Sequence, residues 1–168
     1  MAITGNFSIL GSVANTLGVP ENRSGTMYDF VRQTWGFTDG VLGNQNDLVW
    51  SDRRNLAAGA FDDLVLSAIG NDVFGNAVVF VTLTGIIVRN TSAGAGDTFT
   101  VGSNAGANQF LGPFNVGGIF VTLDPEACYC IWSNIGWAVG AGATDQMRIQ
   151  NTGGNPANYD ILLIGRSV

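Results

Sequence analysis

The segment that decides the fold is Val78-Val79-Phe80-Val81-Thr82-Leu83-Thr84-Gly85-Ile86-Ile87-Val88-Arg89-Asn90. It is dense in β-branched and aromatic residues, which favour strands. It is longer than an average strand, so we expect Gly85 to mark a bulge or a bend. Polar residues interrupt it, and it is far shorter than the roughly 20 apolar residues of a membrane-spanning helix. We therefore expect a buried strand and no contact with a membrane.

Further short strands are expected on both sides of this segment, each bounded by Gly, Asn or Pro. They cover residues 28–35, 48–50, 62–68, 98–102, 109–111, 118–123, 128–132, 136–139, 146–151 and 159–165. No stretch of ten or more residues shows the 3.6-residue period of a helix. We interpret residues 52–55 as a polar turn and 56–61 as a helical turn or a bend. The pattern predicts an all-β protein with a single β-sandwich domain, jelly-roll-like, over residues 27–168.

Residues 1–26 differ from the rest because they are rich in Gly, Asn, Ser and Thr and sustain no period. We predict an extended, loop-rich N-terminal arm with one short strand at residues 7–10. Such arms often become ordered against a neighbouring protein, although a frayed terminus has the same composition.

A weak internal repeat joins two parts of the chain. Ile87-Val88-Arg89-Asn90-Thr91, a glycine-rich turn and Phe99-Thr100-Val101-Gly102 form the first unit. Met147-Arg148-Ile149-Gln150-Asn151-Thr152, a Gly/Asn turn and Tyr159-Asp160-Ile161-Leu162 form the second. We interpret the two units as β-hairpins that a sandwich can place in equivalent positions of its two sheets.

The charge composition argues against several classes of function. Charged residues make up 12% of the 168 residues, about half of the usual fraction of roughly 25%. The chain has no His and no Lys, so the commonest general base and metal ligand and any Schiff-base lysine are missing. The net charge of −6 argues against nucleic acid as a partner. So neutral a surface is easier to understand if copies or partners cover part of it.

No motif points to catalysis or to a bound cofactor. Asp62 and Asp63 are adjacent and would point to opposite faces of a strand, so they cannot act as a pair. A hydrolase that uses only carboxylates from distant strands stays open as a less favoured alternative. Cys128 and Cys130 cannot complete a zinc site alone, and we interpret them as small buried apolar residues rather than as a disulfide between copies. We expect no enzyme activity, no cofactor and no metal.

The residues with the strongest potential for contacts are aromatic or basic. The four tryptophans, Trp35, Trp50, Trp132 and Trp137, suit core or interface packing better than stacking on a sugar. Two adjacent arginines could meet an acidic neighbour or lie in a solvated turn. Our candidate interface residues are Phe7, Ile9, Leu10, Trp35, Trp50, Arg53 and Arg54.

The second half of the chain resembles small virion proteins of tailed bacteriophages, in particular capsid decoration proteins. The resemblance covers roughly residues 60–168. It rests on the segments Ile87-Val88-Arg89-Asn90-Thr91, Gly96-Asp97-Thr98-Phe99-Thr100-Val101-Gly102, Trp137-Ala138-Val139, Gly142-Ala143-Thr144-Asp145, Met147-Arg148-Ile149-Gln150-Asn151 and Tyr159-Asp160-Ile161-Leu162-Leu163-Ile164-Gly165-Arg166-Ser167. These are patterns of strands and turns, without a catalytic signature.

The resemblance implies a β-sandwich that sits on the outer surface of the capsid and stabilises the head. It implies binding to the major capsid protein and to further copies of the chain, with a homotrimer favoured. No targeting segment is visible, so we expect synthesis in the host cytoplasm followed by incorporation into the virion. Two alternatives stay open: a carbohydrate- or receptor-binding module of a viral fibre, and another virion component of the neck, tail or minor capsid.

Overall fold

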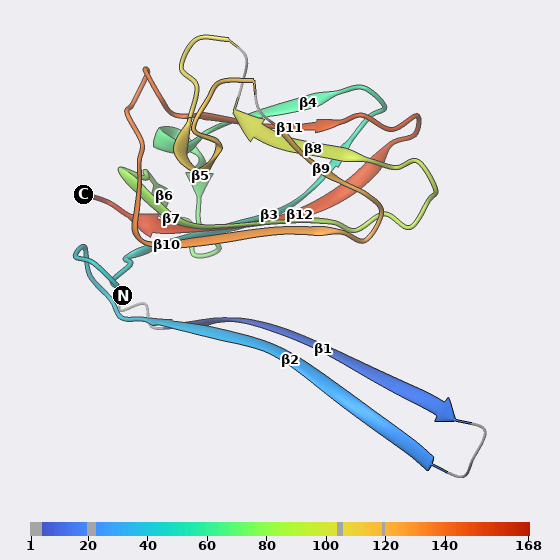
Figure 1. Ribbon diagram of the computed structural model, residues 1–168. Coiled ribbons are helices and arrows are strands. Elements are labelled where there is room, and N and C mark those ends of the chain that lie inside the picture. The colour runs from blue at the N-terminus through green and yellow to red at the C-terminus, as the bar shows by residue number, and fades with distance from the viewer. Residues whose placement is uncertain (1–4, 20–22, 104–105, 119) are drawn as a thin grey trace.

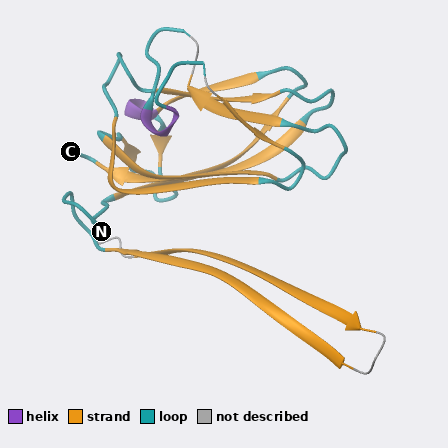
Figure 2. Ribbon diagram, in the orientation of Figure 1, coloured by secondary structure: helices purple, strands orange, loops and turns teal. Residues whose placement is uncertain are grey.

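The body of the protein consists of two four-stranded antiparallel sheets that pack face to face, as the computed structural model shows (Figures 1 and 2). The structure describes the backbone of residues 5–19, 23–103, 106–118 and 120–168, and the side chains from Thr34 onward except that of Trp35. Sheet 1 has the order β10 (Cys128–Ala138), β7 (Thr82–Asn90), β12 (Ala157–Arg166) and β3 (Leu48–Leu56). Sheet 2 has the order β4 (Phe61–Val65), β11 (Gln146–Asn151), β8 (Phe99–Ser103) and β9 (Phe120–Leu123).

These eight strands have the connectivity of a jelly roll. Numbered along the chain, they lie in the order 6-3-8-1 in sheet 1 and 2-7-4-5 in sheet 2. This is the strand order of a double Greek key, and the predicted all-β sandwich is confirmed. Two 3₁₀ turns, η1 (Leu66–Ala68) and η2 (Gly112–Phe114), and a small ladder of β5 (Gly70–Asn71) and β6 (Ala77–Val78) lie in the connections.

The core lies between the two sheets, and alternating residues of the strands fill it. In β12 the buried positions Tyr159, Ile161 and Leu163 alternate with partly or fully exposed ones, as a half-covered strand requires. Across the sandwich, the rings of Tyr159 and Phe99 meet edge to face with 5.5 Å between centroids. Both side chains are fully buried, so this contact ties β12 of sheet 1 to β8 of sheet 2.

Gly85 marks a bulge, as the sequence predicts. The pairing of β7 with β10 and its pairing with β12 both shift register between Gly85 and Leu83. A Cβ atom at Gly85 would lie 2.9 Å from Cε3 of Trp132, so the missing side chain leaves room for that ring. The expected start of the strand at Val78 is wrong. The backbone at Phe80 and Val81 bonds to the carbonyls of Leu66 and Arg166, and β7 begins only at Thr82.

The two predicted hairpins are wrong, but their equivalence has a structural basis. β7 does not pair with β8, and β11 does not pair with β12. Each Asn-Thr pair instead lies at a corner where the chain crosses from one sheet to the other. We call these two sites the Asn-Thr corners, at Asn90-Thr91 and at Asn151-Thr152. The sequence pattern is the same for a tight hairpin and for such a crossing, which explains the error.

The two asparagines make matching hydrogen bonds. The Oδ1 atom of Asn90 accepts a bond from the N–H of Ser92, and that of Asn151 accepts one from the N–H of Gly153, at 3.0 and 2.9 Å. Each Nδ2 donates to backbone carbonyls and lies within 2.7–3.3 Å of three of them. Both side chains are fully buried. Each amide therefore satisfies hydrogen-bonding groups of the backbone at a corner that water cannot reach.

The two threonines repeat the correspondence. Thr91 donates through its N–H and its Oγ1 to the carbonyl of Asn158, next to the start of β12. Thr152 donates in the same way to the carbonyl of Thr98, just before β8. The first corner is therefore hydrogen-bonded to the start of β12, the strand that follows the second corner. The second corner is hydrogen-bonded to the residue before β8, the strand that follows the first corner. Each crossing thus stabilises the other.

The N-terminal arm is a β-hairpin and not a loop-rich segment. β1 (Gly5–Val19) and β2 (Arg23–Phe37) pair antiparallel along their whole length, from Gly5 opposite Phe37 to Val19 opposite Arg23. The expected boundary between residues 26 and 27 therefore falls inside β2. The hairpin projects away from the sandwich (Figure 1). Its polar, glycine-containing strands lack strict alternation, which is why the sequence resembles a loop.

Four smaller expectations need correction. Residues 52–55 belong to β3, whose charged side chains lie on an edge strand rather than in a turn. Residues 109–111 form only an isolated bridge at Gln109 before η2. The segments 128–132 and 136–139 form one strand with an irregularity, β10. Cys128 is exposed and Cys130 half-buried, because both lie on this edge strand.

Candidate interaction surface

The root of the hairpin is fixed to the sandwich. The ring of Phe37, the last residue of β2, stacks on Trp132 of β10 with 5.6 Å between centroids. Arg166, 6% exposed, donates from Nη1 to the carbonyl of Leu42 at 3.0 Å in the connection that follows the hairpin. In the same connection the buried Asn46 accepts a 2.6 Å bond from Oγ1 of Thr84. These contacts set the direction in which the hairpin leaves the body.

Beyond its root the hairpin has little support from the sandwich. In the described part of the chain, neither β1 nor β2 forms a β-ladder with a sandwich strand. A two-stranded hairpin alone is marginally stable in water, and a third strand or a packed face is needed to hold it. By this rule the hairpin on its own should be only marginally stable.

Four of the predicted interface residues belong to this hairpin. The register places Phe7 opposite Trp35, Ile9 opposite Gln33 and Leu10 opposite Arg32. Their side chains lie outside the described part of the structure. The expectation that these residues make contacts stays a prediction, now attached to a projecting element.

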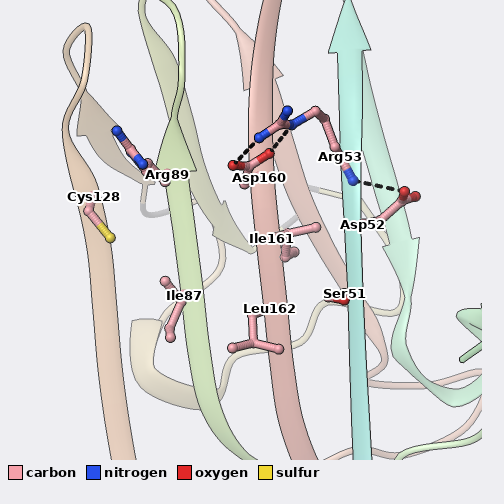
Figure 3. A pocket seen from close by; sticks show the side chains of 9 residues that line it. All are labelled: Ser51, Asp52, Arg53, Ile87, Arg89, Cys128, Asp160, Ile161 and Leu162. Atoms are coloured by element: carbon pink, nitrogen blue, oxygen red, sulfur yellow. Dashed lines mark hydrogen bonds and ion pairs between the residues drawn. The ribbon is translucent and has the colours of Figure 1, made fainter. Parts of the chain in front are cut away.

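The outer face of sheet 1 carries a row of alternating charges (Figure 3). Arg53 of β3 donates from Nε and Nη2 to the two carboxylate oxygens of Asp160 on β12, at 2.5 and 2.9 Å. The register places Arg89 of β7 on the other side of Asp160, with Cys128 of β10 beyond it. None of the ion pairs among the described residues includes Arg89. The row borders a shallow hollow of about 770 Å³.

This row contains charged groups that are already paired or positioned for ion pairing. The hydrogen bonds from Arg53, opposed by partial burial, hold the pKa of Asp160 below its ordinary value, so the carboxylate stays charged. Two guanidinium groups then flank the carboxylate of Asp160, and Asp52 also lines the hollow, so the formal charges of these four side chains cancel. Arg89 belongs to no ion pair among the described residues, and a guanidinium group suits a carboxylate ligand.

The second predicted arginine has a structural role. Arg54 bonds to Asp52 at 2.8 Å and to Asp62 of β4 at 3.1 Å, and Asp62 also accepts a 2.7 Å bond from the hydroxyl of Tyr159. Burial alone would lower the pKa of Arg54, but the bonds to the two carboxylates outweigh it and raise the pKa. Burial and the bond to Asp62 raise the pKa of Tyr159. The cluster joins the two sheets, so Arg54 is not a free contact residue.

Trp50 is also a structural residue. It is 4% exposed and belongs to the core, where the guanidinium of Arg54 lies 5.4 Å from the centroid of its ring. Its prediction as an interface residue is therefore wrong for the isolated chain, because its position in β3 points between the sheets. Trp132 packs on Phe37, and Trp137 lies against the core. These three rings do not form a common platform for a sugar.

The sequence analysis did not identify Arg89 as a site residue or β10 as an edge strand. Arg89 looked like the polar end of a strand, and only the register with Asp160 gives it a place beside Arg53. The run of uncharged residues from Cys128 to Ala138 was visible, but nothing in it shows that the strand lies at the edge of a sheet. Edge position is a property of the topology and not of the local sequence.

The described residues contain no group of three or more His, Cys, Asp or Glu side chains that could hold a metal ion. No helix in the described ranges is long and apolar enough to cross a membrane. Comparisons with family models, with curated proteins and with solved structures gave no match. The function must therefore be argued from the residues and their arrangement.

Proposed function

We propose that the protein is a structural component of a tailed-bacteriophage virion, a capsid decoration protein that binds the outer surface of the head and stabilises it. The observation that carries the proposal is the projecting hairpin. The root of this hairpin is anchored in the jelly roll by Phe37, Asn46 and Arg166, whereas the described backbone of its strands forms a ladder with no strand of the sandwich. An arm that is fixed at one end and uncovered elsewhere suits attachment to another protein.

The resemblance to decoration proteins supports the proposal through the residues that build the fold. Its segments form β7, β8, β11 and β12 and both Asn-Thr corners. The jelly roll is an architecture that viral capsid domains use, but lectins and cupins share it. The fold alone therefore does not distinguish a capsid protein from a lectin or a cupin. The projecting hairpin is the feature that favours the capsid role.

The geometry suggests how attachment would work. A preformed hairpin loses less conformational entropy on binding than a disordered tail, because its root and its cross-strand pairing are already set. Partner contacts on the arm would be repeated over every symmetry-related position of a capsid, so that contacts of modest individual strength give firm attachment. The proposed partners are the major capsid protein and further copies of this chain.

The test is reconstitution on capsids that lack the protein. Purified wild-type protein is mixed with such capsids and imaged, and we expect saturable, symmetric occupancy of the outer surface. The variant Val13→Asp places a charge in the middle of β1 and should reduce the occupancy at least tenfold. Val73→Asp makes the same change at a sandwich residue that is 78% exposed and should bind like the wild type.

Three outcomes would contradict the proposal or its mechanism. Wild-type protein that fails to bind capsids, combined with measurable affinity for a glycan array, would favour the carbohydrate-binding module of a viral fibre. Specific labelling of the neck or tail of a particle would favour another virion component. Equal occupancy by Val13→Asp and Val73→Asp would show that the capsid is bound without the arm.

A further inference from the structure

Among the described residues, β10 is the longest edge strand of the sandwich. It lies at an end of sheet 1 and pairs only with β7. None of its eleven residues is buried, although most are apolar, whereas most residues of β12 are buried. No residue from Cys128 to Ala138 is charged. A long, uncharged edge strand is a template for pairing with another strand.

The other three sheet edges are protected in ordinary ways. β3 carries Asp52, Arg53 and Arg54, and β4 carries Asp62 and Asp63. β9 has only four residues. Charges and short length are the usual means by which sheet edges avoid pairing. The lack of both at β10 singles out this edge as a binding site for a strand.

The hydrogen-bond pattern shows which groups this edge offers. The N–H of Asn90 donates to the carbonyl of Ala127 directly opposite it, at 2.9 Å. Bonded and non-bonded positions alternate along an antiparallel pair, so Tyr129 and Ile131 bond to β7. The backbone N–H and C=O groups of Cys128 and Cys130 therefore point to the open edge.

β1 is likewise a strand with a neighbour on one side only. Its fifteen residues include no charge, and it pairs with β2 on one side only. The hairpin needs a third strand, and β10 needs a neighbour. β1 does not pair with β10 of its own chain, and the hairpin projects away from that sheet (Figure 1). Chains of net charge −6 repel one another, and pairing of two uncharged strands brings no like charges together.

We propose that β1 of one copy adds to the open edge of β10 in a second copy. The pairing would extend the sheet to the order β2-β1-β10-β7-β12-β3. Such a contact joins two different surfaces, so it is heterologous and closes into a ring when the rotation allows. A ring of three is the trimer that the resemblance implies. This inference rests on the self-association within the proposed function, but it does not depend on the capsid.

The first test is a proline substitution at the edge, measured with purified protein and no capsids. Cys130→Pro removes an N–H that faces the open edge and leaves the bonds between β10 and β7 in place. Cys130→Val keeps that N–H and is the matched control. In sedimentation over a concentration series, the wild type and Cys130→Val should associate, with a trimer mass at the upper end. Cys130→Pro should remain a monomer with wild-type thermal unfolding.

A second measurement covers the case in which the proline variant does not fold. In the wild-type protein, hydrogen exchange at the amides of Cys128 and Cys130 should slow at least tenfold between dilute and concentrated samples. A wild type that stays monomeric, edge amides that exchange rapidly at every concentration, or a folded Cys130→Pro that associates normally would each overturn the inference. Failure here with intact capsid binding would leave the decoration role standing, and the reverse result would leave the strand addition standing.

Discussion

The sandwich and the hairpin differ in how many stabilising contacts the chain itself provides. In the sandwich, the buried amides of Asn90 and Asn151 find partners within the chain, at the Asn-Thr corners, where they reach the carbonyls that the crossings leave open. In the hairpin, two fifteen-residue strands bond to each other and project from the body (Figure 1). The sandwich therefore contains the contacts that stabilise the fold, and the hairpin is the element that we propose for binding.

The largest effect should come from the Asn-Thr corners. We expect Asn151→Ala to lower the free energy of unfolding by about 3 kcal/mol, because several buried carbonyls lose their donor at once. Asn90→Ala should cost a similar amount, since the two corners are equivalent. Chemical denaturation measures both. Asn158→Ala, at an exposed residue, is the control and should change the free energy by less than about 0.5 kcal/mol.

A large loss for one corner and none for the other would break the correspondence between them. It would show that the repeated Asn-Thr sequence is accidental at one site. Equal losses at both corners would support a fold in which each crossing fastens the other.

An intermediate effect is expected where the two regions meet. Trp132→Ala removes the ring that stacks on Phe37 and that fills the space above Gly85. We expect a loss of about 1–2 kcal/mol in the free energy of unfolding, because the ring is only partly buried. Cleavage by a protease near the hairpin root should become faster. Trp132→Phe keeps an aromatic contact and should retain most of both properties, whereas unchanged cleavage in Trp132→Ala would mean that the stack does not hold the root.

The smallest effect on stability should come from the charge row on the outer face. Arg53 is fully exposed, so Arg53→Ala should leave the denaturation midpoint nearly unchanged at moderate salt. Any contribution of the pair has a defined pH dependence. The folded pKa of Asp160 lies below its ordinary value of 3.8, so the stabilisation is present above that pH and is lost as the pH falls through the folded pKa.

The corresponding measurement compares wild type and Arg53→Ala from pH 6 to pH 2. The two curves should converge at the acid end. A difference that grows on acidification would contradict the assigned ion pair. A large difference at neutral pH would show that the outer face contributes to stability like the core.

The sequence was sufficient for the class of fold, because β-branched runs such as 86–88 and their turn boundaries depend on local chemistry alone. It also located the bulge at Gly85, since a glycine inside a long strand has few other roles. The Asn-Thr repeat was recognised, but it was assigned to hairpins. Whether a turn joins neighbours in one sheet or crosses between sheets depends on long-range pairing, which these short segments do not encode.

The candidate site was less predictable for the same reason. Arg53 and Arg54 are adjacent in sequence, yet strand alternation gives one to the outer face and the other to the cluster with Asp62. Trp50 has the composition of an interface residue and lies in the core. The open edge of β10 follows only from the order of strands in sheet 1. Local composition therefore indicated that arginine and tryptophan residues make important contacts. It did not indicate which of these residues lie on the same surface.

The most direct test of the separation between the two regions is hydrogen exchange along the whole chain, measured against concentration and with added capsids. The account predicts slow exchange in the sandwich strands under every condition. It predicts fast exchange in β1 and β2 in dilute protein, slowing at high concentration or on capsids. Hairpin amides that are as slow as those of β7 and β12 in the most dilute sample would contradict the account, because the hairpin would then be stable without a partner.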